Sequence, residues 1–275
     1  MSVIIFLLFC WIIVLPVLRY VVFWASNART GHMAEISRGL HGHVLSHVLL
    51  GTISAVMAEM AVLLQVPLAF IFKGNARPGV PVIFVHGLYH NPTAWFWFRI
   101  LLARAGYGNF HSYGYNSFSK PLEPAVQGLA ELMDSVLHDN PGEKVVLVGH
   151  SLGGLVCRKT ASRPEFSGRV RALVALGSPH GGSLLAGLGL GPMARGLYPG
   201  KAVIRAMDEC HDTDAPKLAV YSLVDDYVLP MSGLRVKRDG WEEQVCSPVS
   251  HVGMLFSQDV AWRVAGFLDG TQNSR

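Results

Sequence analysis

One serine between two glycines has the setting that covalent chemistry requires. Ser151 is the centre of Gly-His-Ser-Leu-Gly at 149–153, which follows the apolar run Lys144–Val148 and precedes a helical pattern. In this strand-turn-helix setting the G-x-S-x-G spacing forms a tight, strained turn, because a Cβ at either glycine would clash. The turn lifts the serine hydroxyl out of the sheet, over the positive end of the following helix. We therefore predict that Ser151 is a nucleophile, which needs a base and an acid to activate it.

The elements that must position this turn are strands that alternate with helical patterns. They begin where the composition changes at Arg77, and such alternation is typical of βα units with a mainly parallel sheet. The clearest helical pattern places Leu122, Leu129 and Val136 on one buried face. The predicted strands are Pro81–Val85, Phe110–Tyr113, Lys144–Val148, Val170–Leu176, Lys217–Ser222 and Trp241–Cys246.

Three motifs in this order resemble those of the α/β-hydrolase superfamily, in particular bacterial lipases and lipase-like esterases. They are Pro-Val-Ile-Phe-Val-His-Gly-Leu at 81–88, Gly-His-Ser-Leu-Gly-Gly at 149–154 and Leu-Gly-Ser-Pro-His-Gly-Gly-Ser at 176–183. The resemblance extends over 81–268. It implies a reduced α/β-hydrolase fold of about six mainly parallel strands, because the antiparallel strands that open larger members have no counterpart before Pro81.

The resemblance also implies that the acid and then the histidine follow the serine along the chain. Of the three later histidines, His180 and His211 precede the best acid, whereas His251 follows it just before an apolar helical pattern. We therefore predict His251 as the general base. The alternative for His251 is a residue that caps a helix.

The acid belongs on the loop after the strand Lys217–Ser222, where it can orient the histidine. Asp225 and Asp226 stand together there, and the spacing in Tyr-Ser-Leu-Val-Asp-Asp-Tyr-Val matches the lipase pattern at Asp225. We predict Asp225 as the acid and expect Asp226 to be a turn residue or a surface acid.

Acyl transfer also needs donors for the developing oxyanion. The backbone N–H of Leu152, directly after the nucleophile, is one candidate by geometry, and that of Leu88 in the loop after His-Gly is the other. We expect His86 to brace this loop rather than to take part in the chemistry.

Two apolar segments are predicted to border an acyl pocket. Residues 182–215 begin with leucines that alternate with glycines, which is typical of a lid, although an ordinary connection packed on the sheet is the alternative. The second segment is Trp-Phe-Trp-Phe at 95–98. Together they favour an acyl group over a sugar or a phosphate as the bound moiety.

The region 1–76 is predicted to associate with a membrane, and 77–275 to be the catalytic domain. The run Val3–Trp24 is long enough to cross a bilayer, and its single charge, Arg19, lies near the end where its stem can reach the interface. A second apolar stretch, 44–72, contains Glu59, which argues against a lone lipid-facing span, and Pro67, which should bend or end a helix.

Charge and cysteine placement give a first indication of sidedness. Arg19, Arg29 and Arg38 follow the first apolar run, so the loop 25–43 is expected in the cytoplasm. If the stretch 44–72 crosses back, the catalytic domain lies outside, which we slightly favour. A disulfide between Cys210 and Cys246 would agree with an oxidising compartment.

The composition excludes several classes of protein and partner. With 51% hydrophobic and 15% charged residues the chain is not disordered, and its scattered net charge of +4 predicts no nucleic-acid partner. No dinucleotide, phosphate-loop or metal-ligand spacing is present, so neither a cofactor nor a metal is expected. We predict a membrane-anchored serine hydrolase that cleaves carboxylic esters, with acyl lipids and membrane lipids as partners. The alternatives are an acyltransferase or amidase on the same residues, and a non-catalytic scaffold.

Overall fold

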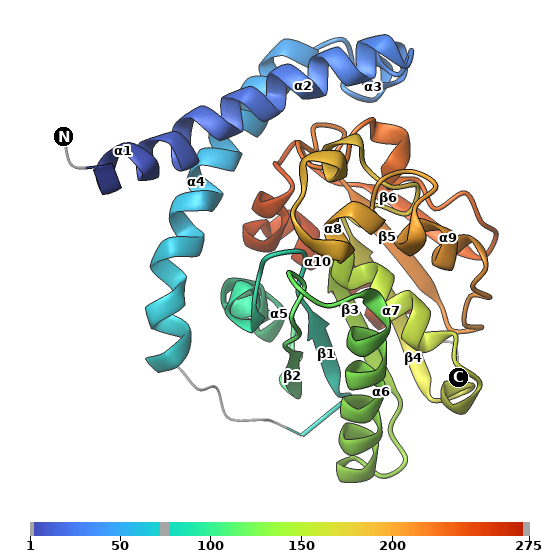
Figure 1. The fold of residues 1–275 in the computed structure, drawn as a ribbon. Helices are drawn as coiled ribbons and strands as arrows, with labels where there is room; N and C mark the ends of the chain where they lie inside the picture. The colour runs from blue at the N-terminus through green and yellow to red at the C-terminus, as the bar shows by residue number, and fades with distance from the viewer. Residues whose placement is uncertain (1–2, 72–77, 272–275) are drawn as a thin grey trace.

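A computed structural model describes residues 3–71 and 78–271 of the protein and contains one sheet of six parallel strands. The spatial order of the strands is β2-β1-β3-β4-β5-β6 (Figure 1). Their bounds are β1 Val82–Val85, β2 Phe110–Tyr113, β3 Val145–His150, β4 Val170–Leu176, β5 Lys217–Tyr221 and β6 Trp241–Val245. The predicted sheet is confirmed, because each strand lies within two residues of its expected bounds.

The central strands are buried on both faces, as near-continuous apolar sequences require. All six residues of β3 are buried, and the strand pairs with β1 on one side and with β4 on the other. The carboxyl ends of β3, β4 and β5 therefore lie side by side. The loops that leave these ends carry Ser151, Gly177 and Asp225.

Helices cover both faces of the sheet (Figure 1). One face packs against α6, α7, α8 and α9, and the other against α5 and α10. The predicted buried positions of α6 are confirmed, since Leu122, Leu129 and Val136 all lie in the core between the sheet and α6–α9. The bounds are α5 Phe96–Arg104, α6 Leu122–Asp139, α7 Leu152–Ala161, α8 Gly191–Gly196, α9 Ala202–Asp208 and α10 Gln258–Gly270. The short helical turns are η2 Pro92–Trp95, η3 Pro164–Phe166, η4 Leu184–Leu188, η5 Met231–Leu234 and η6 Val252–Phe256.

The N-terminal region forms two long apolar helices. Residues 3–29 run as α1 Val3–Phe9, the π-helical turn η1 Cys10–Val14 and α2 Leu15–Arg29. After α3 Met33–Gly39, helix α4 spans Val44–Ile71 and continues through Pro67, so the proline does not end it. Phe72, the predicted end of this stretch, and the predicted domain boundary at Arg77 lie outside the described residues.

By length and composition both helices are suited to cross a membrane. Within Val3–Arg29 and Val44–Gln65, an 18-residue window has a mean hydropathy of 2.5 and 1.8, respectively. Their inner faces nevertheless pack on the rest of the protein. Tyr20 and Phe23 of α2 and Ala55 of α4 lie in one buried cluster with residues of the loop after β5, including Val224 and Leu229. In Figure 1, α2 and α3 lie across one end of the sheet, and α4 runs down its flank beside α5.

Candidate active site

Ser151 occupies the sharp turn between β3 and α7. Its backbone has φ 55° and ψ −127°, a strained conformation for a residue with a side chain. Neighbouring glycines make the turn possible: a Cβ at Gly149 would meet the backbone of Gly153, and a Cβ at Gly153 would meet the carbonyl oxygen of Val85. The predicted turn is therefore present, and it presents Ser151 at the carboxyl end of the sheet.

Asp225 and His251 form a buried hydrogen-bonded pair. The imidazole Nδ1–H of His251 donates to Asp225 Oδ2 over 2.7 Å. The other oxygen, Oδ1, accepts the backbone N–H groups of Tyr227 and Val228 at 2.9 and 2.8 Å, which fixes the plane of the carboxylate. With its proton on Nδ1, neutral His251 keeps the lone pair of Nε2 free to accept a proton.

The turn after β4 brings this pair close to the serine. The backbone N–H of Ser151 donates to Leu176 O over 2.8 Å. The next residue, Gly177, has φ +56°, and a Cβ there would lie 3.2 Å from His251 Nδ1 and 3.3 Å from Asp225 Oδ2. Within 3–71 and 78–271 no hydrogen bond joins the hydroxyl of Ser151 to His251. Such bonds are often formed only when substrate is bound.

His150, the residue before the nucleophile, also holds the histidine loop. Its Nε2–H donates to the carbonyl oxygen of His251 over 3.0 Å, and the two rings lie 4.6 Å apart. The sequence predicts no role for His150, because it occupies the variable position of the G-x-S-x-G pattern. The structure makes it a brace between the serine turn and the loop of His251.

The electrostatic surroundings of His251 favour its protonated form. Burial alone would lower the pKa of His251, but the charge of Asp225 and its hydrogen bond outweigh this effect, so the pKa is raised above 6.5. Asp226 acts in the same direction. A base with a raised pKa accepts the serine proton more readily, and it is lost to protonation at low pH.

The loop after β1, which carries Gly87 and Leu88, packs against the serine turn. A Cβ at Gly87 would lie 2.9 Å from the Cβ of Ser151. The next N–H group, that of Leu88, and the N–H of Leu152 at the start of α7 have no acceptor among the hydrogen bonds of the described residues. Both predicted donors therefore lie on segments next to Ser151, and their role in holding the oxyanion stays a prediction.

His86 holds this loop in place. Its Nε2 accepts the backbone N–H of Tyr115 over 3.2 Å, so its proton lies on Nδ1, which donates to Gly87 O over 2.8 Å. The ring also stacks on that of Tyr115 at 4.4 Å. Burial lowers the pKa of His86 to about 4, which keeps it neutral. These contacts are those of a brace for the loop of Leu88.

The sequence model described as "Alpha/beta hydrolase family" matches residues 82–268. The chain belongs to the alpha/beta hydrolase family. This matched part of the hydrolase contains the serine turn, the Asp225–His251 pair and the loop of Leu88.

Individual relatives agree with this assignment. A probable esterase of Oryza sativa subsp. indica is 38% identical to the hydrolase over 106 residues, which are 36% of this chain and 38% of the relative. The match thus covers well under half the length of that curated relative. The mature lipase of Bacillus licheniformis superposes with a TM-score of 0.58 at 17% identity, over 72% of this chain and 94% of the lipase. A structure described as a membrane phospholipase A gives 0.53 at 17% identity, over 86% of this chain and 100% of that one. At such identities these two structures establish the fold.

Asp226 of the hydrolase is not the surface acid or simple turn residue that the sequence suggested. It is fully buried, and its Oδ1 accepts the backbone N–H of His251 over 2.9 Å. Its Oδ2 accepts the guanidinium Nε–H of Arg19 over 2.7 Å. The expectation for Arg19 is corrected as well: its head does not reach an interface, because it is bound inside the protein.

The predicted aromatic border of the acyl pocket is wrong for two of its residues. Trp95 and Phe98 are fully buried beneath the sheet against Phe84, on the face covered by α5. They lie on the inner side of η2 and α5, where consecutive aromatic residues point in different directions. Their role is to fill the core of the hydrolase.

A different apolar surface lies beside the loop of Leu88. We call it the apolar rim, and it consists of the exposed side chains of Tyr89, Phe118, Leu188 and Leu190. The Tyr89 hydroxyl donates to Leu190 O over 2.5 Å and accepts the Leu190 N–H over 2.6 Å, and its ring lies 5.8 Å from that of Phe118. In the rest of the predicted lid segment, α8 and α9 are packed in the core, so the exposed leucines belong to its first part.

The sequence left open whether Cys210 and Cys246 are bonded, and the structure shows both thiols free, like those of Cys10 and Cys157. The thiol of Cys210 contacts the Ser162 hydroxyl at 2.9 Å, at the end of α7. Cys246 is packed in the cluster on the α5 and α10 face. The sheet separates the two thiols. A disulfide therefore gives no support to an outside location.

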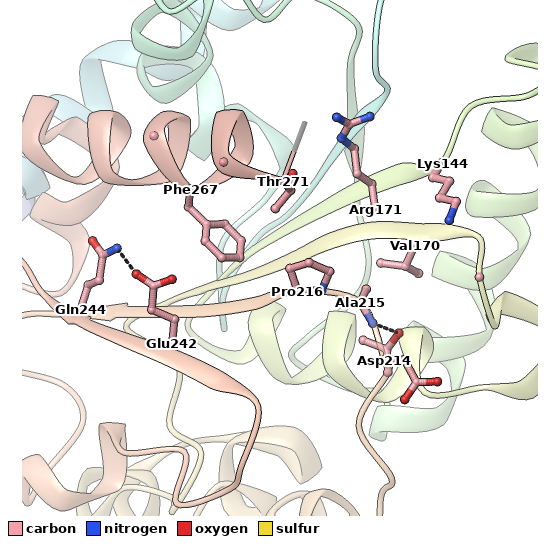
Figure 2. A pocket seen from close by; sticks show the side chains of 14 residues that line it. Lys144, Val170, Arg171, Asp214, Ala215, Pro216, Glu242, Gln244, Phe267 and Thr271 are labelled. Atoms are coloured by element: carbon pink, nitrogen blue, oxygen red, sulfur yellow. Dashed lines mark hydrogen bonds between the residues drawn. The ribbon is translucent and has the colours of Figure 1, made fainter. Parts of the chain in front are cut away.

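A groove of about 660 Å³, lined by both polar and apolar residues, lies at the end of the sheet opposite to Ser151 (Figure 2). Lys144, Val170 and Pro216 line it, and these residues lie at the amino ends of β3, β4 and β5. Because Ser151 lies at the carboxyl ends, this groove is not the site of the predicted chemistry. Across residues 3–71 and 78–271, no group of three or more His, Cys, Asp or Glu side chains is arranged to hold a metal ion.

Proposed function

We propose that the protein is a membrane-anchored serine hydrolase that cleaves carboxylic esters of acyl lipids through an acyl-enzyme. Ser151 is the nucleophile, His251 the general base and Asp225 the acid that orients it. The observation that carries this proposal is the buried Asp225–His251 pair. It lies beside Gly177, in the turn after β4 that follows the acceptor of the Ser151 N–H, and Ser151 itself has a strained backbone. The curated esterase and the solved lipase support ester hydrolysis as the reaction.

The first half of the reaction forms the acyl-enzyme. The Ser151 oxygen attacks the ester carbonyl while His251 Nε2 takes its proton, and Asp225 stabilises the imidazolium. The oxyanion accepts hydrogen bonds from the N–H groups of Leu88 and Leu152, each worth roughly 2.7–4 kcal/mol by the cost of its removal. The tetrahedral intermediate then expels the alcohol, which leaves with the proton from His251.

The second half releases the acid. His251 takes a proton from water, the hydroxide attacks the acyl-serine, and the same two N–H groups hold the second oxyanion. Collapse of that intermediate breaks the acyl–oxygen bond and returns the proton to Ser151. The free enzyme and a carboxylic acid result.

The apolar rim supports a substrate with an acyl chain. Leu188 is 82% exposed and Leu190 60% exposed, although both are large apolar side chains beside the loop of Leu88. Apolar surface near a reaction centre gains free energy when a ligand covers it, at about 0.8 kcal/mol per buried methylene. A long-chain ester is therefore the substrate class that suits this surface.

Activity on p-nitrophenyl esters from C2 to C12 tests this assignment. We expect kcat/KM to rise with chain length by about fourfold per methylene until the rim is covered, which is 0.8 kcal/mol converted to a ratio. Leu188→Ala should flatten this rise, whereas Trp262→Ala, which removes an exposed aromatic residue on α10, should leave it unchanged. A flat series, or a steep fall beyond C4, would instead indicate a short-chain esterase.

The outer face of α4 supports association with a membrane. Its exposed large apolar side chains recur about every four residues and include Leu45, Leu49, Ile53, Met57 and Leu64. The opposite face is docked, since the Ser54 hydroxyl accepts the Ser250 N–H over 3.1 Å and Glu59 is buried. We propose that the outer face contacts lipid acyl chains while the inner face holds the catalytic domain at the membrane.

Flotation of the full chain with phosphatidylcholine vesicles tests this placement. The wild-type protein is expected in the vesicle fraction, and Leu49→Glu with Ile53→Glu is expected to shift it to the unbound fraction. Each carboxylate on a lipid-facing helix costs up to about 2.5–3.5 kcal/mol at mid-bilayer. Trp262→Glu is the control for added charge on another exposed surface. Because the helix at Val3–Arg29 can also hold the chain on vesicles, the comparison is made at limiting lipid. If the double variant there partitions like wild type, α4 does not face lipid.

The side of the membrane is inferred from the charge pattern together with the contacts of the loop 25–43. The positive charges after the first apolar run still favour a cytoplasmic loop at 25–43. A domain outside would require α4 to cross back. Glu35 and Ile36 of the loop 25–43 contact the catalytic domain, so the loop and the domain share one side of the membrane. We therefore propose the cytoplasmic side in place of the outside location that the sequence slightly favoured, to be tested by added protease on intact cells.

A further inference from the structure

A buried network of charged and polar side chains joins the N-terminal helices to the loop of Asp225. Its centre is Arg19 on α2, which donates from Nε to Asp226 Oδ2 over 2.7 Å and from Nη2 to Glu59 Oε1 over 3.2 Å. Glu59 on α4 also accepts the indole N–H of Trp11 over 3.0 Å. The side chains of Arg19, Glu59 and Asp226 are 13%, 7% and 0% exposed, so water screens the network little.

The other end of this network touches the proposed base. Asp226 uses one oxygen for Arg19 and the other, Oδ1, for the backbone N–H of His251 at 2.9 Å. The guanidinium of Arg19 also lies over the ring of Tyr227, with 4.4 Å from Cζ to the centroid. That ring is in turn 5.1 Å from the ring of His251. Arg19 is thus one residue away from His251 along two routes.

Holding the helix in place does not require these charges. Tyr20 and Phe23 already pack in the apolar cluster with the loop after β5. Tyr20 also donates its hydroxyl to Val224 O over 2.8 Å, and Asn27 Oδ1 accepts the N–H of Met231 over 2.9 Å. Because a buried ion pair often stabilises a fold no better than apolar side chains of similar size, the charges call for another explanation.

We propose that Arg19 is a positioning residue for the reaction, which acts on His251 through Asp226. By holding Oδ2 of Asp226, it orients the carboxylate whose Oδ1 accepts the backbone N–H of His251. It thereby sets the backbone position of His251, and with it the direction of the imidazole between Asp225 and Ser151. This inference rests on the proposed function. It makes the N-terminal helix a part of the catalytic framework as well as a membrane anchor.

The pH profile reports this connection, because charged and titratable groups from several elements surround His251. They are Asp225, Asp226 and Tyr227 on the loop after β5, His150 on β3, His90 after β1, and Arg19 on α2. Arg19 lowers the pKa of His251, against the stronger opposite effect of Asp225. Since the base works only when neutral, kcat/KM falls on the acid side as His251 is protonated.

Steady-state kinetics of the full-length protein on a p-nitrophenyl ester test the proposal. Arg19→Gln should lower kcat by about 10- to 100-fold with little change in KM, because a small displacement of a catalytic group has effects of this size. The acid limb of kcat/KM should move to higher pH, since loss of the positive charge eases protonation of His251. Arg19→Lys keeps the charge but not the planar fork, so its kcat should be intermediate and its acid limb close to that of wild type.

Glu35→Gln provides the matched control. Glu35 on α3 pairs with Arg235, so this ion pair also joins the N-terminal region to the segment after β5, but neither residue contacts His251. Its removal should leave kcat and the acid limb unchanged. If Arg19→Gln behaves like this control, or lowers only the melting temperature, the proposal is wrong. If Arg19→Gln does not fold, a wild-type kcat and acid limb in Arg19→Lys would overturn it equally.

Labelling with a fluorophosphonate separates this inference from the proposed function. If the wild-type protein is labelled at Ser151 but Arg19→Gln has wild-type kinetics, only the positioning role is contradicted. A wild-type protein that is not labelled contradicts the serine-hydrolase assignment itself.

Discussion

Replacing Ser151 by alanine is expected to lower the turnover of p-nitrophenyl esters by about a millionfold, the size found when a triad nucleophile is removed. Only the hydroxyl is lost, and the strained backbone at φ 55° is retained by the packing of the neighbouring glycines. Rates of the purified full-length variant, measured against buffer alone, give the result. The activity that remains should reflect the oxyanion donors and substrate binding.

Ser178→Ala is a suitable control for this experiment. Ser178 is a buried serine close to the turn, and its hydroxyl has no hydrogen-bond partner among the described residues. It should keep near-wild-type rates and bind a fluorophosphonate at Ser151, whereas Ser151→Ala should not be labelled. Near-wild-type turnover by Ser151→Ala would exclude the serine mechanism, and a folded, unlabelled wild-type protein would favour the scaffold alternative.

Replacing Asp225 by asparagine is expected to lower kcat by about ten-thousandfold. An amide at this position would present an N–H or a neutral oxygen to His251 Nδ1, so the histidine would no longer be held in the tautomer with a free Nε2. Steady-state kinetics with urea unfolding of the same sample separate this effect from a loss of stability. The variant should remain folded, because one amide oxygen can still accept the N–H groups of Tyr227 and Val228.

The neighbouring substitution, Asp226→Asn, distinguishes the two carboxylates. It should cost far less in kcat than Asp225→Asn, by about 10- to 100-fold through displacement of His251. It should cost more in the free energy of unfolding, by about 3 kcal/mol, because a buried arginine loses one of its two ionic partners. If Asp226→Asn were the crippling variant and Asp225→Asn the mild one, the orienting acid would be Asp226.

The sheet and the order of the chemical groups could be predicted because their signals are local. Each central strand is an uninterrupted apolar run, as a strand covered by helices on both faces must be. The Ser151 turn carries its own glycines. The pairing of His251 with Asp225 followed from the family's order and spacing, which gave the positions although the contact spans 26 residues.

The errors concern side chains whose environment depends on distant parts of the chain. Arg19 is a lone charge in an apolar run, and its partner Asp226 is 207 residues away. Asp225 and Asp226 are adjacent in sequence, yet one receives the imidazole of His251 and the other its backbone N–H. Trp95 and Phe98 could not be assigned to the core from composition alone, because exposed and buried runs of aromatic residues have the same composition.

Contacts over so long a separation have a consequence for the order of events during synthesis. The hydrogen bond from Tyr20 to Val224 spans 204 residues, and ribosomes add about 5–20 residues per second. Roughly 10–40 s therefore pass between the appearance of the first helix and that of its docking site. Through this interval the apolar face of α2 must be covered by something other than its final neighbours.

The network suggests how Arg19 is neutralised in the meantime. Glu59 follows Arg19 by only 40 residues, so this pair can form as soon as α4 emerges, long before Asp226 exists. A helical hairpin of the nascent chain that carries an internal ion pair can bind the membrane with its charge compensated. When the last third of the chain is complete, Asp226 becomes the second ionic partner of Arg19. The loop that carries Asp225 and Asp226 therefore docks on the N-terminal helices last.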